Sequence, residues 1–548
     1  MTGDISVAGT QDINGVKKTK KQCGTTCSLL LLVISYMHLS FILFSVVFLY
    51  RAPPLTCLSK QDEDNSTTDY HGAILECSSR ERSDNLTAIA NATWPYDRTD
   101  NITGHQSDIL YDRFCENGWT FDTKEGNTVV SEFGLECTAA WKRPTLQSLF
   151  MVGLLLGSLF GGAISDRFGR KYTFAAAFII HGCLHLPLSF TTSYVQYIVL
   201  LHFTGILHIV QYLAGFVLVQ ELVQTSKRTI AALAVNVSFG LGYLIVPLVA
   251  YFIRDWRWFL RFYTIACVCY FPVLWFIPKS PKWVAYRPSD KLTIRNAKEN
   301  ETFLGANNNV KQLDSEKKPT RTIDLLKKPI LRRRVLIVCW LWNVSFLGFY
   351  TLSLNTSNLG GNIYLNCVYG ALVDIVSYVT TALILSKKGR RSSTAFTIGI
   401  SGIMCLITPM LRNANVNIGL ASAMIGKFFI TTAMSIVILY TGELFPTLLR
   451  NTAYGIASMT ARIGSAISPF IIFAGETMNL SIPFYVTGCL SVLSTFLIIW
   501  LPETKVTGLP NTVEEALELE IYRTKFSVRK LSASFRRKSE ATTIDTAA

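Results

Sequence analysis

The chain has 548 residues, of which 50% are hydrophobic and only 16% are charged, and its formal net charge is +15. Soluble globular proteins carry about 25% charged residues, so the composition excludes an ordinary soluble domain and indicates a protein with many membrane spans. The positive charge lies in the predicted connections and tails, and nucleic-acid binding is therefore not indicated.

Twelve apolar runs follow one another along the chain, each close to the ~20 residues that a spanning helix needs. They predict an all-α membrane protein with twelve transmembrane helices. The first run follows a lysine-bearing tail (residues 1–28) and has no small-residue cleavage site, so we expect a retained helix rather than a signal peptide. The runs lie at 29–50, 145–164, 173–190, 195–222, 230–253, 258–277, 335–354, 362–385, 393–411, 416–441, 452–473 and 482–501.

Basic residues divide unevenly between the predicted connections. The segment 278–334 alone holds fifteen Lys and Arg. Of the short connections on the opposite side of the membrane, three hold no Lys or Arg, and the basic residues in the others are Arg254, Arg257 and Arg412. Because basic residues stay on the cytosolic side, we expect both termini in the cytosol. The basic C-terminal tail (502–548) would face anionic membrane lipid.

The first outside segment, residues 51–144, is polar and carries two kinds of covalent signal. Four acceptor sequons within forty residues predict N-glycosylation, at Asn65, Asn85, Asn91 and Asn101. Four cysteines in an oxidising compartment predict two disulfides with three connectivities open; they are Cys57, Cys77, Cys115 and Cys137.

Three pairs of motifs recur at nearly one spacing. The offsets are 221, 222 and 224 residues, and the pairs are Ser165–Lys171 with Ser386–Arg391, Glu221 and Arg228 with Glu443 and Arg450, and Pro278–Lys282 with Pro502–Lys505. Such a repeat predicts two six-helix halves, 29–277 and 335–501, joined by the basic cytosolic linker 278–334.

With GGAISDRFGRK at Gly161–Lys171, the chain resembles the major facilitator superfamily. Four further segments resemble the organic cation, organic anion and carnitine transporters, nearest to the carnitine and zwitterion branch. They are VSEFGLEC (Val130–Cys137), AYFIRDWR (Ala250–Arg257), SLNTSNLGGNIYLN (Ser353–Asn366) and Tyr440–Pro469. The resemblance implies a plasma-membrane transporter that works by alternating access. Such a transporter would need no cofactor or metal. Whether it couples transport to sodium or to protons stays open.

The resemblance also implies a latch of acid–base pairs at the cytosolic helix ends. Its residues would be Asp166, Arg167, Arg170, Glu221, Arg228, Glu443, Arg450 and Glu503. The chain departs from the family at Lys279, where an acid is usual, and at Ser386, where aspartate is common. Either the latch is weakened or redirected, or such surface pairs are dispensable at ~0–1 kcal/mol each.

Arg462 stands at the centre of the apolar run Asn451–Phe473, where a charge costs at least ~2.5–3.5 kcal/mol. It shares one helical face with small or polar residues: Gly455, Ser458, Ser465 and Pro469. A planar guanidinium binds a carboxylate through two hydrogen bonds, so we predict that Arg462 binds substrate. The alternative is a buried arginine with a structural partner.

Other candidates for the substrate site lie at membrane depth. Asp374 and Lys427 stand near mid-span and would either line the site or form a structural ion pair. The resemblance adds Tyr212, Asn236, Phe239, Phe349 and Tyr350; aromatic faces attract a quaternary ammonium at ~0.5–2 kcal/mol each, although such residues also serve as packing. His181, His185, His202 and His208 form a lesser cluster.

Together these features predict a monomeric transporter of small organic ions, most specifically carnitine-like zwitterions or organic cations that bear a carboxylate. The nearest alternative is an organic anion transporter. From another class, a non-transporting receptor or scaffold stays open because of the departures at Lys279 and Ser386. The chain shows no metal-ligand spacing or nucleophile motif of an enzyme.

Overall fold

The computed structural model describes residues 28–53, 55–57, 74–75, 119–121, 126–136, 139–224, 227–279, 328–504, 510 and 515–516. The four sequon asparagines, three of the candidate cysteines (Cys77, Cys115 and Cys137) and most of the predicted linker lie outside the described residues. Glycosylation and disulfide pairing therefore stay predictions. The described chain divides into two compact units.

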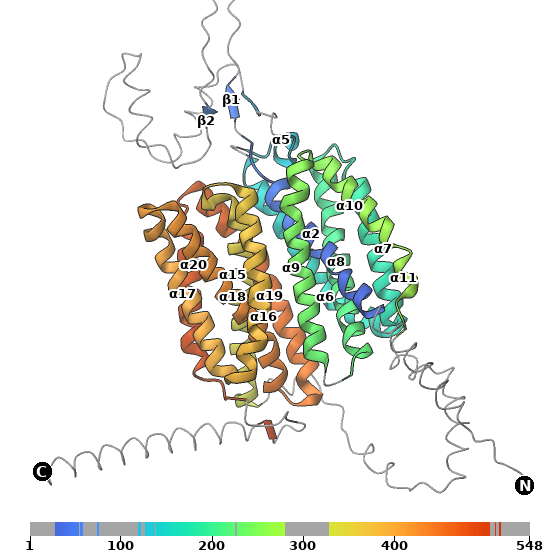
Figure 1. The fold of residues 1–548 in the computed structure, drawn as a ribbon, viewed down its shortest axis with the longest axis vertical. Helices are drawn as coiled ribbons and strands as arrows, with labels where there is room; N and C mark the ends of the chain where they lie inside the picture. The colour runs from blue at the N-terminus through green and yellow to red at the C-terminus, as the bar shows by residue number, and fades with distance from the viewer. Residues whose placement is uncertain are drawn as a thin grey trace, which may run out of the picture. The chain divides into compact units, whose positions relative to one another are not determined.

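The first unit holds the helices from the first span to α11 (Figure 1). Its first helix spans Ser28–Leu49 and contains α2 after a break at Ser35 and Tyr36. The elements are α2 (Met37–Leu49), α5 (Val129–Phe133), α6 (Lys142–Phe168), α7 (Arg170–Leu188), α8 (Tyr194–Leu222), α9 (Arg228–Phe252), α10 (Trp256–Tyr270) and α11 (Val273–Phe276).

The second unit holds the remaining long helices, among which α15 and α18 are the most enclosed. Its elements are α15 (Pro329–Leu354), the short 3-10 helix η5 (Asn355–Leu359), α16 (Ile363–Lys387), α17 (Arg390–Ala414), α18 (Val416–Leu444), α19 (Thr447–Thr477) and α20 (Ile482–Ile498).

Each of the twelve predicted runs coincides with a described helix. Nine of the described helices are long and apolar enough to cross a membrane by length and composition; α7, α10 and α20 are not among them. The predicted run 258–277 holds two helices, α10 and α11, between which the chain turns at Phe271 and Pro272. Proline lacks the amide hydrogen that would continue the helical ladder.

The two units repeat one pattern of helix packing. In the first, α2 packs along α9, α6 along α8, and α7 along both α8 and α10; in the second, α15 packs along α19, α16 along α18, and α17 along both α18 and α20. Close approach requires small residues: a Cβ atom built on Gly205 would lie 3.3 Å from the Gly153 Cα. The helix packing is thus the spatial form of the sequence repeat.

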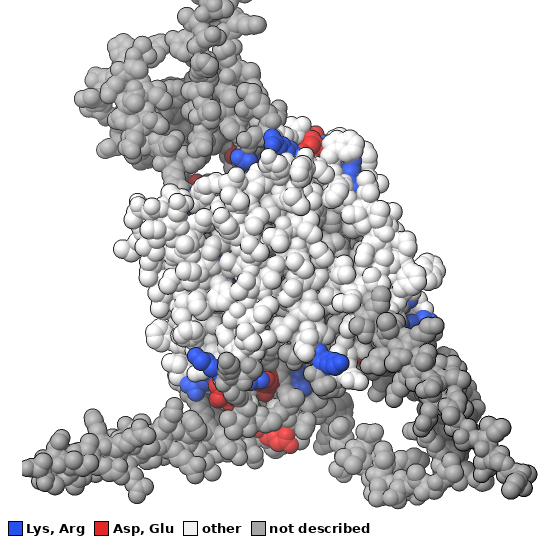
Figure 2. All heavy atoms as spheres, in the orientation of Figure 1, with Lys and Arg blue, Asp and Glu red and all other residues white. Residues whose placement is uncertain are grey.

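Polar residues begin several helices, and the charged residues visible on the surface in Figure 2 lie near helix ends. The Asp255 carboxylate accepts hydrogen bonds from the first backbone amides of α10, and Asn362 and Asn415 do the same for α16 and α18, which satisfies amides that have no helical partner. On the face seen in Figure 2, charged side chains gather toward the helix ends and the middle stretches are uncharged, as a membrane-spanning helix requires.

A small antiparallel sheet lies in the first outside segment, where no strand was predicted. Its strands are β1 (Leu55–Cys57), β2 (Ile74–Leu75) and β3 (Trp119–Phe121), in the order β2-β1-β3. Leu55 pairs with Leu75 on one side and Phe121 on the other. Strands this short give too few residues for an alternating pattern to be read from sequence.

Candidate functional site

Arg462 lies on the enclosed face of α19. Its side chain is 9% exposed, whereas Ile463, Ile467 and Phe470 on other positions of the helix are between 44% and 48% exposed. Ser465, one turn further on, is fully buried. The apolar residues therefore take the exposed face, and the guanidinium points into the second unit, as the spacing of the small and polar residues predicted.

The immediate neighbours of the Arg462 guanidinium come from α15. Its Cζ atom lies 5.4 Å from the centre of the Phe346 ring, and the Tyr350 hydroxyl interacts with it. The buried Arg462 Nε has no hydrogen-bond partner, and within the described ranges no Asp or Glu forms an ion pair with this arginine. A buried guanidinium in this state can accept an anionic ligand without first breaking a salt bridge.

Phe346 was missed in the sequence analysis, and helical spacing could have found it. It lies four residues before Tyr350, and residues at this spacing share one helical face. The same face holds Trp342, whose ring stacks on Phe346 with the centroids 5.6 Å apart. Phe349 packs edge-on against Tyr350 at 5.3 Å. Phe346 and Tyr350 thus contact Arg462 from α15, and Trp342 and Phe349 pack against these two rings.

Asp374 and Lys427 bind each other. The Lys427 Nζ lies 3.0 Å from an Asp374 oxygen, and the two side chains are 1% and 2% exposed. Lys427 also donates to the Gly370 carbonyl oxygen at 2.8 Å, and the Thr431 hydroxyl donates to the second Asp374 oxygen at 3.0 Å. Both groups have partners within the unit, so of the two sequence-based alternatives the contacts favour the structural ion pair.

Tyr212, Asn236 and Phe239 lie in the first unit and are each partly buried. The Tyr36 hydroxyl donates to the Tyr212 carbonyl oxygen at 3.1 Å, and the two rings meet edge to face at 5.5 Å. Phe239 meets the Phe44 ring at 6.0 Å. The contacts place two of these three residues against the first helix.

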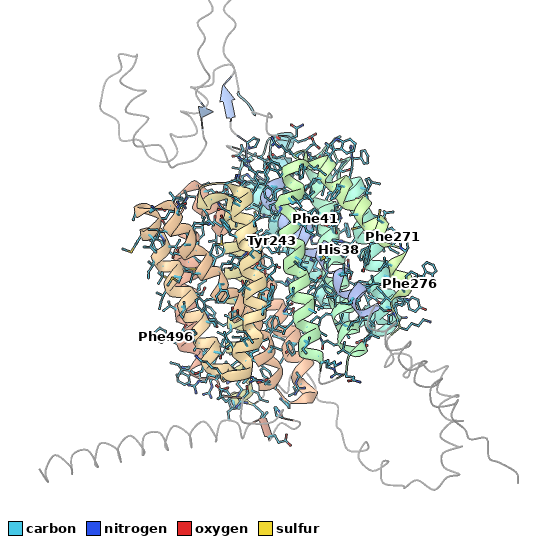
Figure 3. All side chains as sticks on the ribbon, viewed as in Figure 1. His38, Phe41, Tyr243, Phe271, Phe276 and Phe496 are labelled. Atoms are coloured by element: carbon cyan, nitrogen blue, oxygen red, sulfur yellow. The ribbon has the colours of Figure 1, made fainter. Side chains whose placement is uncertain are left out.

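Three of the four predicted histidines form a buried cluster, which a fourth from α2 joins. The His181 ring lies 4.9 Å from His185, 5.4 Å from His208 and 6.0 Å from His38, centre to centre. Figure 3 shows His38 within the first unit. His202 instead faces the Leu149 carbonyl oxygen at 2.9 Å.

Neutral hydrogen-bond partners surround this cluster. The Tyr263 hydroxyl lies 3.2 Å from His181 Nδ1, and the Gln211 side-chain nitrogen lies 2.9 Å from His38 Nε2. Among the described residues, no group of three or more His, Cys, Asp and Glu is arranged to hold a metal ion.

Near the end of α6, one arginine of the first unit forms ion pairs with two acids of the predicted latch. Arg170 forms an ion pair with Asp166 and lies 3.5 Å from Glu221, with the arginine and Glu221 largely enclosed. It also donates to the Ser165 carbonyl oxygen at 3.1 Å. Of the other predicted residues in this unit, Arg167 stacks on its neighbour Phe168 at 5.7 Å.

The second unit repeats this arrangement with Arg390, which was not predicted. Arg390 lies 3.0 Å from Glu443, and its backbone amide donates to Glu503 at 2.7 Å. The Thr504 hydroxyl donates to Glu443 at 2.5 Å. Arg390 stands 220 residues after Arg170, so the repeat offset was the signal that could have identified it.

Two other predicted arginines, Arg450 and Arg228, have hydrogen bonds that involve the backbone. The Arg450 guanidinium lies 3.5 Å from the Phe445 carbonyl oxygen, and the Arg228 carbonyl oxygen accepts from the Gln220 side chain at 3.4 Å. Neither forms an ion pair with an acid in the described part of the chain. Among the described residues, the basic partner of Glu443 is therefore Arg390.

The departure at Lys279 makes the two units chemically different at this end. By the repeat offset of 224 residues, Lys279 corresponds to Glu503, which caps α17. Lys279 instead lies over the Tyr172 ring at 5.4 Å, near the start of α7. A cation thus stands close to a helix N-terminus, where an anion is favoured.

Comparisons with known proteins agree with this geometry. The profile of the Major Facilitator Superfamily matches residues 130–469. The chain is 34% identical to solute carrier family 22 member 21 of Mus musculus, over 76% of each chain. It is 34% identical to organic cation/carnitine transporter 2 of Homo sapiens, over 74% of this chain and 75% of the relative.

A further relative, solute carrier family 22 member 4 of Mus musculus, is 33% identical over 87% of this chain and 89% of its own. Among solved structures, a D-xylose-proton symporter superposes with a TM-score of 0.53 at 16% identity, covering 87% of this chain and 99% of the symporter. The latter likeness concerns the fold alone. It confirms the predicted twelve-helix architecture.

Proposed function

The chain belongs to the Major Facilitator Superfamily, and within it to the family of organic cation and carnitine transporters, and we propose that it carries small zwitterions with a carboxylate and a quaternary ammonium. Members of this family are membrane transporters rather than enzymes. We propose further that it works by alternating access in the plasma membrane with both termini in the cytosol.

The observation that carries the substrate proposal is the state of Arg462. Its guanidinium is nine-tenths buried and has no acid partner among the described residues. A bound carboxylate would supply the missing charge and two hydrogen bonds in the geometry that guanidinium favours. A purely cationic substrate would add a second positive charge beside the first.

The ammonium end of such a substrate needs a different environment. Asp374 is held by Lys427 and Thr431, so it is a poor counter-charge for a ligand. The Tyr350 and Phe349 rings on α15 offer aromatic faces, each of which attracts a quaternary ammonium by ~0.5–2 kcal/mol. The relative from Homo sapiens is named as an organic cation and carnitine transporter, which agrees with this chemistry.

Uptake measurements test the proposal. Cells that express the chain are given labelled carnitine, a labelled dicarboxylate and tetraethylammonium, each with and without sodium and at two pH values. We expect carnitine uptake to exceed the other two. Preferred uptake of the dicarboxylate would favour the organic anion alternative, and ligand binding without any flux would favour a receptor.

Matched variants test the role of Arg462. Arg462→Lys keeps the charge but removes the fork of donors, and we expect carnitine uptake to fall about tenfold or more, as for a lost charge-assisted hydrogen bond. Arg412→Lys makes the same change at another buried arginine of the second unit and serves as the control. Unchanged carnitine uptake by Arg462→Lys at equal surface expression would contradict the assignment.

A further inference from the structure

An open groove lies on the first unit where α7 ends and α8 begins. Its volume is about 510 Å³, and its lining includes Pro187, Phe190, Thr191, Val195, Val199 and Leu200. Phe190, Val195 and Val199 are between 49% and 64% exposed. In a protein that spans a bilayer, an exposed apolar groove between the ends of two packed helices is a surface for acyl chains.

Arg261 on α10 stands at the rim of this groove. Its Cζ atom lies 4.6 Å from the centre of the Phe190 ring and 4.8 Å from that of Trp258. Two aromatic contacts hold the planar guanidinium in one orientation. Trp258 is 61% exposed, as aromatic residues at a membrane–water interface are.

Arg261 makes few hydrogen bonds with the described residues. Its Nε donates weakly to the Ser189 hydroxyl at 3.4 Å, and its two terminal nitrogens have no hydrogen-bond acceptor in the described part of the chain. The nearby acids are engaged elsewhere: Glu132 binds Arg257 at 2.7 Å, and Asp255 accepts from the first amides of α10. The terminal nitrogens form the fork that matches a phosphate.

The position of this arginine is also unusual for its side of the membrane. The groove lies at the end of α7 opposite Arg170, and the predicted orientation places that end outside, where basic residues are scarce. A structural role in an ion pair would account for such a charge, and Arg257 has that role with Glu132. Arg261 has no such acid among the described residues, and a ligand phosphate at the groove would supply a counter-charge.

We propose that this groove binds one phospholipid molecule. The acyl chain lies along Phe190, Val195 and Val199, and the headgroup phosphate accepts hydrogen bonds from the Arg261 guanidinium. With the predicted orientation the lipid belongs to the outer leaflet. The site is separate from the Arg462 cluster, and its occupancy does not depend on which substrate the protein carries.

Photo-crosslinking tests the site directly. The full chain is reconstituted in phosphatidylcholine nanodiscs with a trace of phosphatidylcholine or diacylglycerol, each bearing a diazirine in an identical acyl chain. Mass spectrometry then maps the labelled residues. We expect the phosphatidylcholine probe to label residues 187–200 about tenfold more than the diacylglycerol probe, the factor expected from one charge-assisted hydrogen bond.

Matched variants separate the phosphate contact from the acyl contact. Arg261→Gln should abolish the preference for the phosphate-bearing probe, whereas Arg254→Gln, which changes an exposed arginine stacked on Tyr251, should retain it. Val199→Trp should reduce labelling by both probes, whereas Val376→Trp, at a valine of similar exposure in the other unit, should not.

Two results would overturn the proposal. One is equal labelling of residues 187–200 by the two probes in the unchanged chain. The other is an undiminished preference for the phosphatidylcholine probe in a folded Arg261→Gln variant. Folding of each variant is checked by size-exclusion chromatography before crosslinking, and Arg261→Lys, which keeps the charge, should retain part of the preference.

Discussion

The Lys427 ammonium lies 3.0 Å from the Asp374 carboxylate, and the two side chains are 1% and 2% exposed. This ion pair joins α16 to α18 inside the second unit. Thr431 supplies a further hydrogen bond to Asp374 and Gly370 accepts one from Lys427. Because Asp374 and Lys427 satisfy each other, Arg462 is a better candidate than either of them to meet a substrate carboxylate.

Breaking this pair from one side should destabilise the protein strongly. Asp374→Asn leaves the Lys427 charge buried without a counter-charge, and we expect a loss of about 3–5 kcal/mol. The double variant Asp374→Leu with Lys427→Met replaces both groups by apolar ones and should recover most of the loss. Thermal unfolding in detergent, followed by size-exclusion chromatography, measures both effects.

The same variants separate a structural role from substrate binding. A stable double variant that still takes up carnitine supports the structural ion pair. A double variant that folds normally but has lost uptake would instead place Asp374 or Lys427 in the substrate site, as the other sequence-based interpretation held.

The Glu132–Arg257 pair should make stability depend on pH. The hydrogen bond from Arg257 lowers the pKa of Glu132, so the folded state binds this proton less readily than the unfolded state. The stabilisation is therefore present above the ordinary carboxyl pKa of about 4.3 and is lost as the pH falls through the lowered value.

We expect the melting temperature of the unchanged chain to fall more steeply between about pH 5 and about pH 3 than that of Glu132→Gln. Arg257→Gln removes the partner of Glu132 and should flatten the profile in the same way. If the unchanged chain and both variants show parallel pH profiles, this pair does not contribute to acid sensitivity.

The contact between Arg390 and Glu443 predicts which arginine stabilises the end of the second unit. Arg390→Gln removes the ion pair with Glu443, and we expect a loss of about 1–3 kcal/mol, since both partners are partly enclosed. Arg450→Gln, whose guanidinium contacts a backbone carbonyl at 3.5 Å, should cost less. Melting temperatures of the two variants, compared at one pH and salt concentration, decide between them; a larger effect at Arg450 would contradict the role assigned to Arg390.

Restoring an acid at position 279 should stabilise the first unit. Lys279→Glu places a carboxylate near the start of α7 and beside Lys171. We expect the attraction of this carboxylate to the helix dipole and to the Lys171 ammonium to contribute about 0.5–1 kcal/mol. Lys279→Gln, which only removes the positive charge, is the control. A melting temperature of Lys279→Glu no higher than that of Lys279→Gln would show that the departure from the family motif has no electrostatic cost.

The ring beneath Arg462 should matter for uptake. Phe346→Leu keeps an apolar side chain but removes the aromatic face 5.4 Å from the guanidinium, which contributes ~0.5–2 kcal/mol to its orientation. We expect a rise of about two- to thirtyfold in the apparent KM for carnitine, in line with that energy. Phe396→Leu, an exposed aromatic position of the same unit, should leave KM unchanged, and an unchanged KM in Phe346→Leu would remove this ring from the site.

The sequence by itself determined the class of fold and the charge at the centre of α19. The lengths of the apolar runs, the uneven distribution of Lys and Arg and the spacing of the repeated motifs can all be read along the chain. They do not depend on which residues meet in space. They led to the helices, to the two units with one packing pattern and to Arg462. They also identified Asp166, Glu221, Glu443 and Glu503 as acids at the helix ends.

Only the tertiary structure decided which residues meet. Arg390 rather than Arg450 pairs with Glu443, Lys427 neutralises Asp374, and Phe346 lies beneath Arg462. Each of these contacts joins different helices, and the distance between two helices depends on how their side chains interlock rather than on either sequence alone. The sign of the central charge was therefore readable from the chain, but the absence of an acid beside it in the described structure was not.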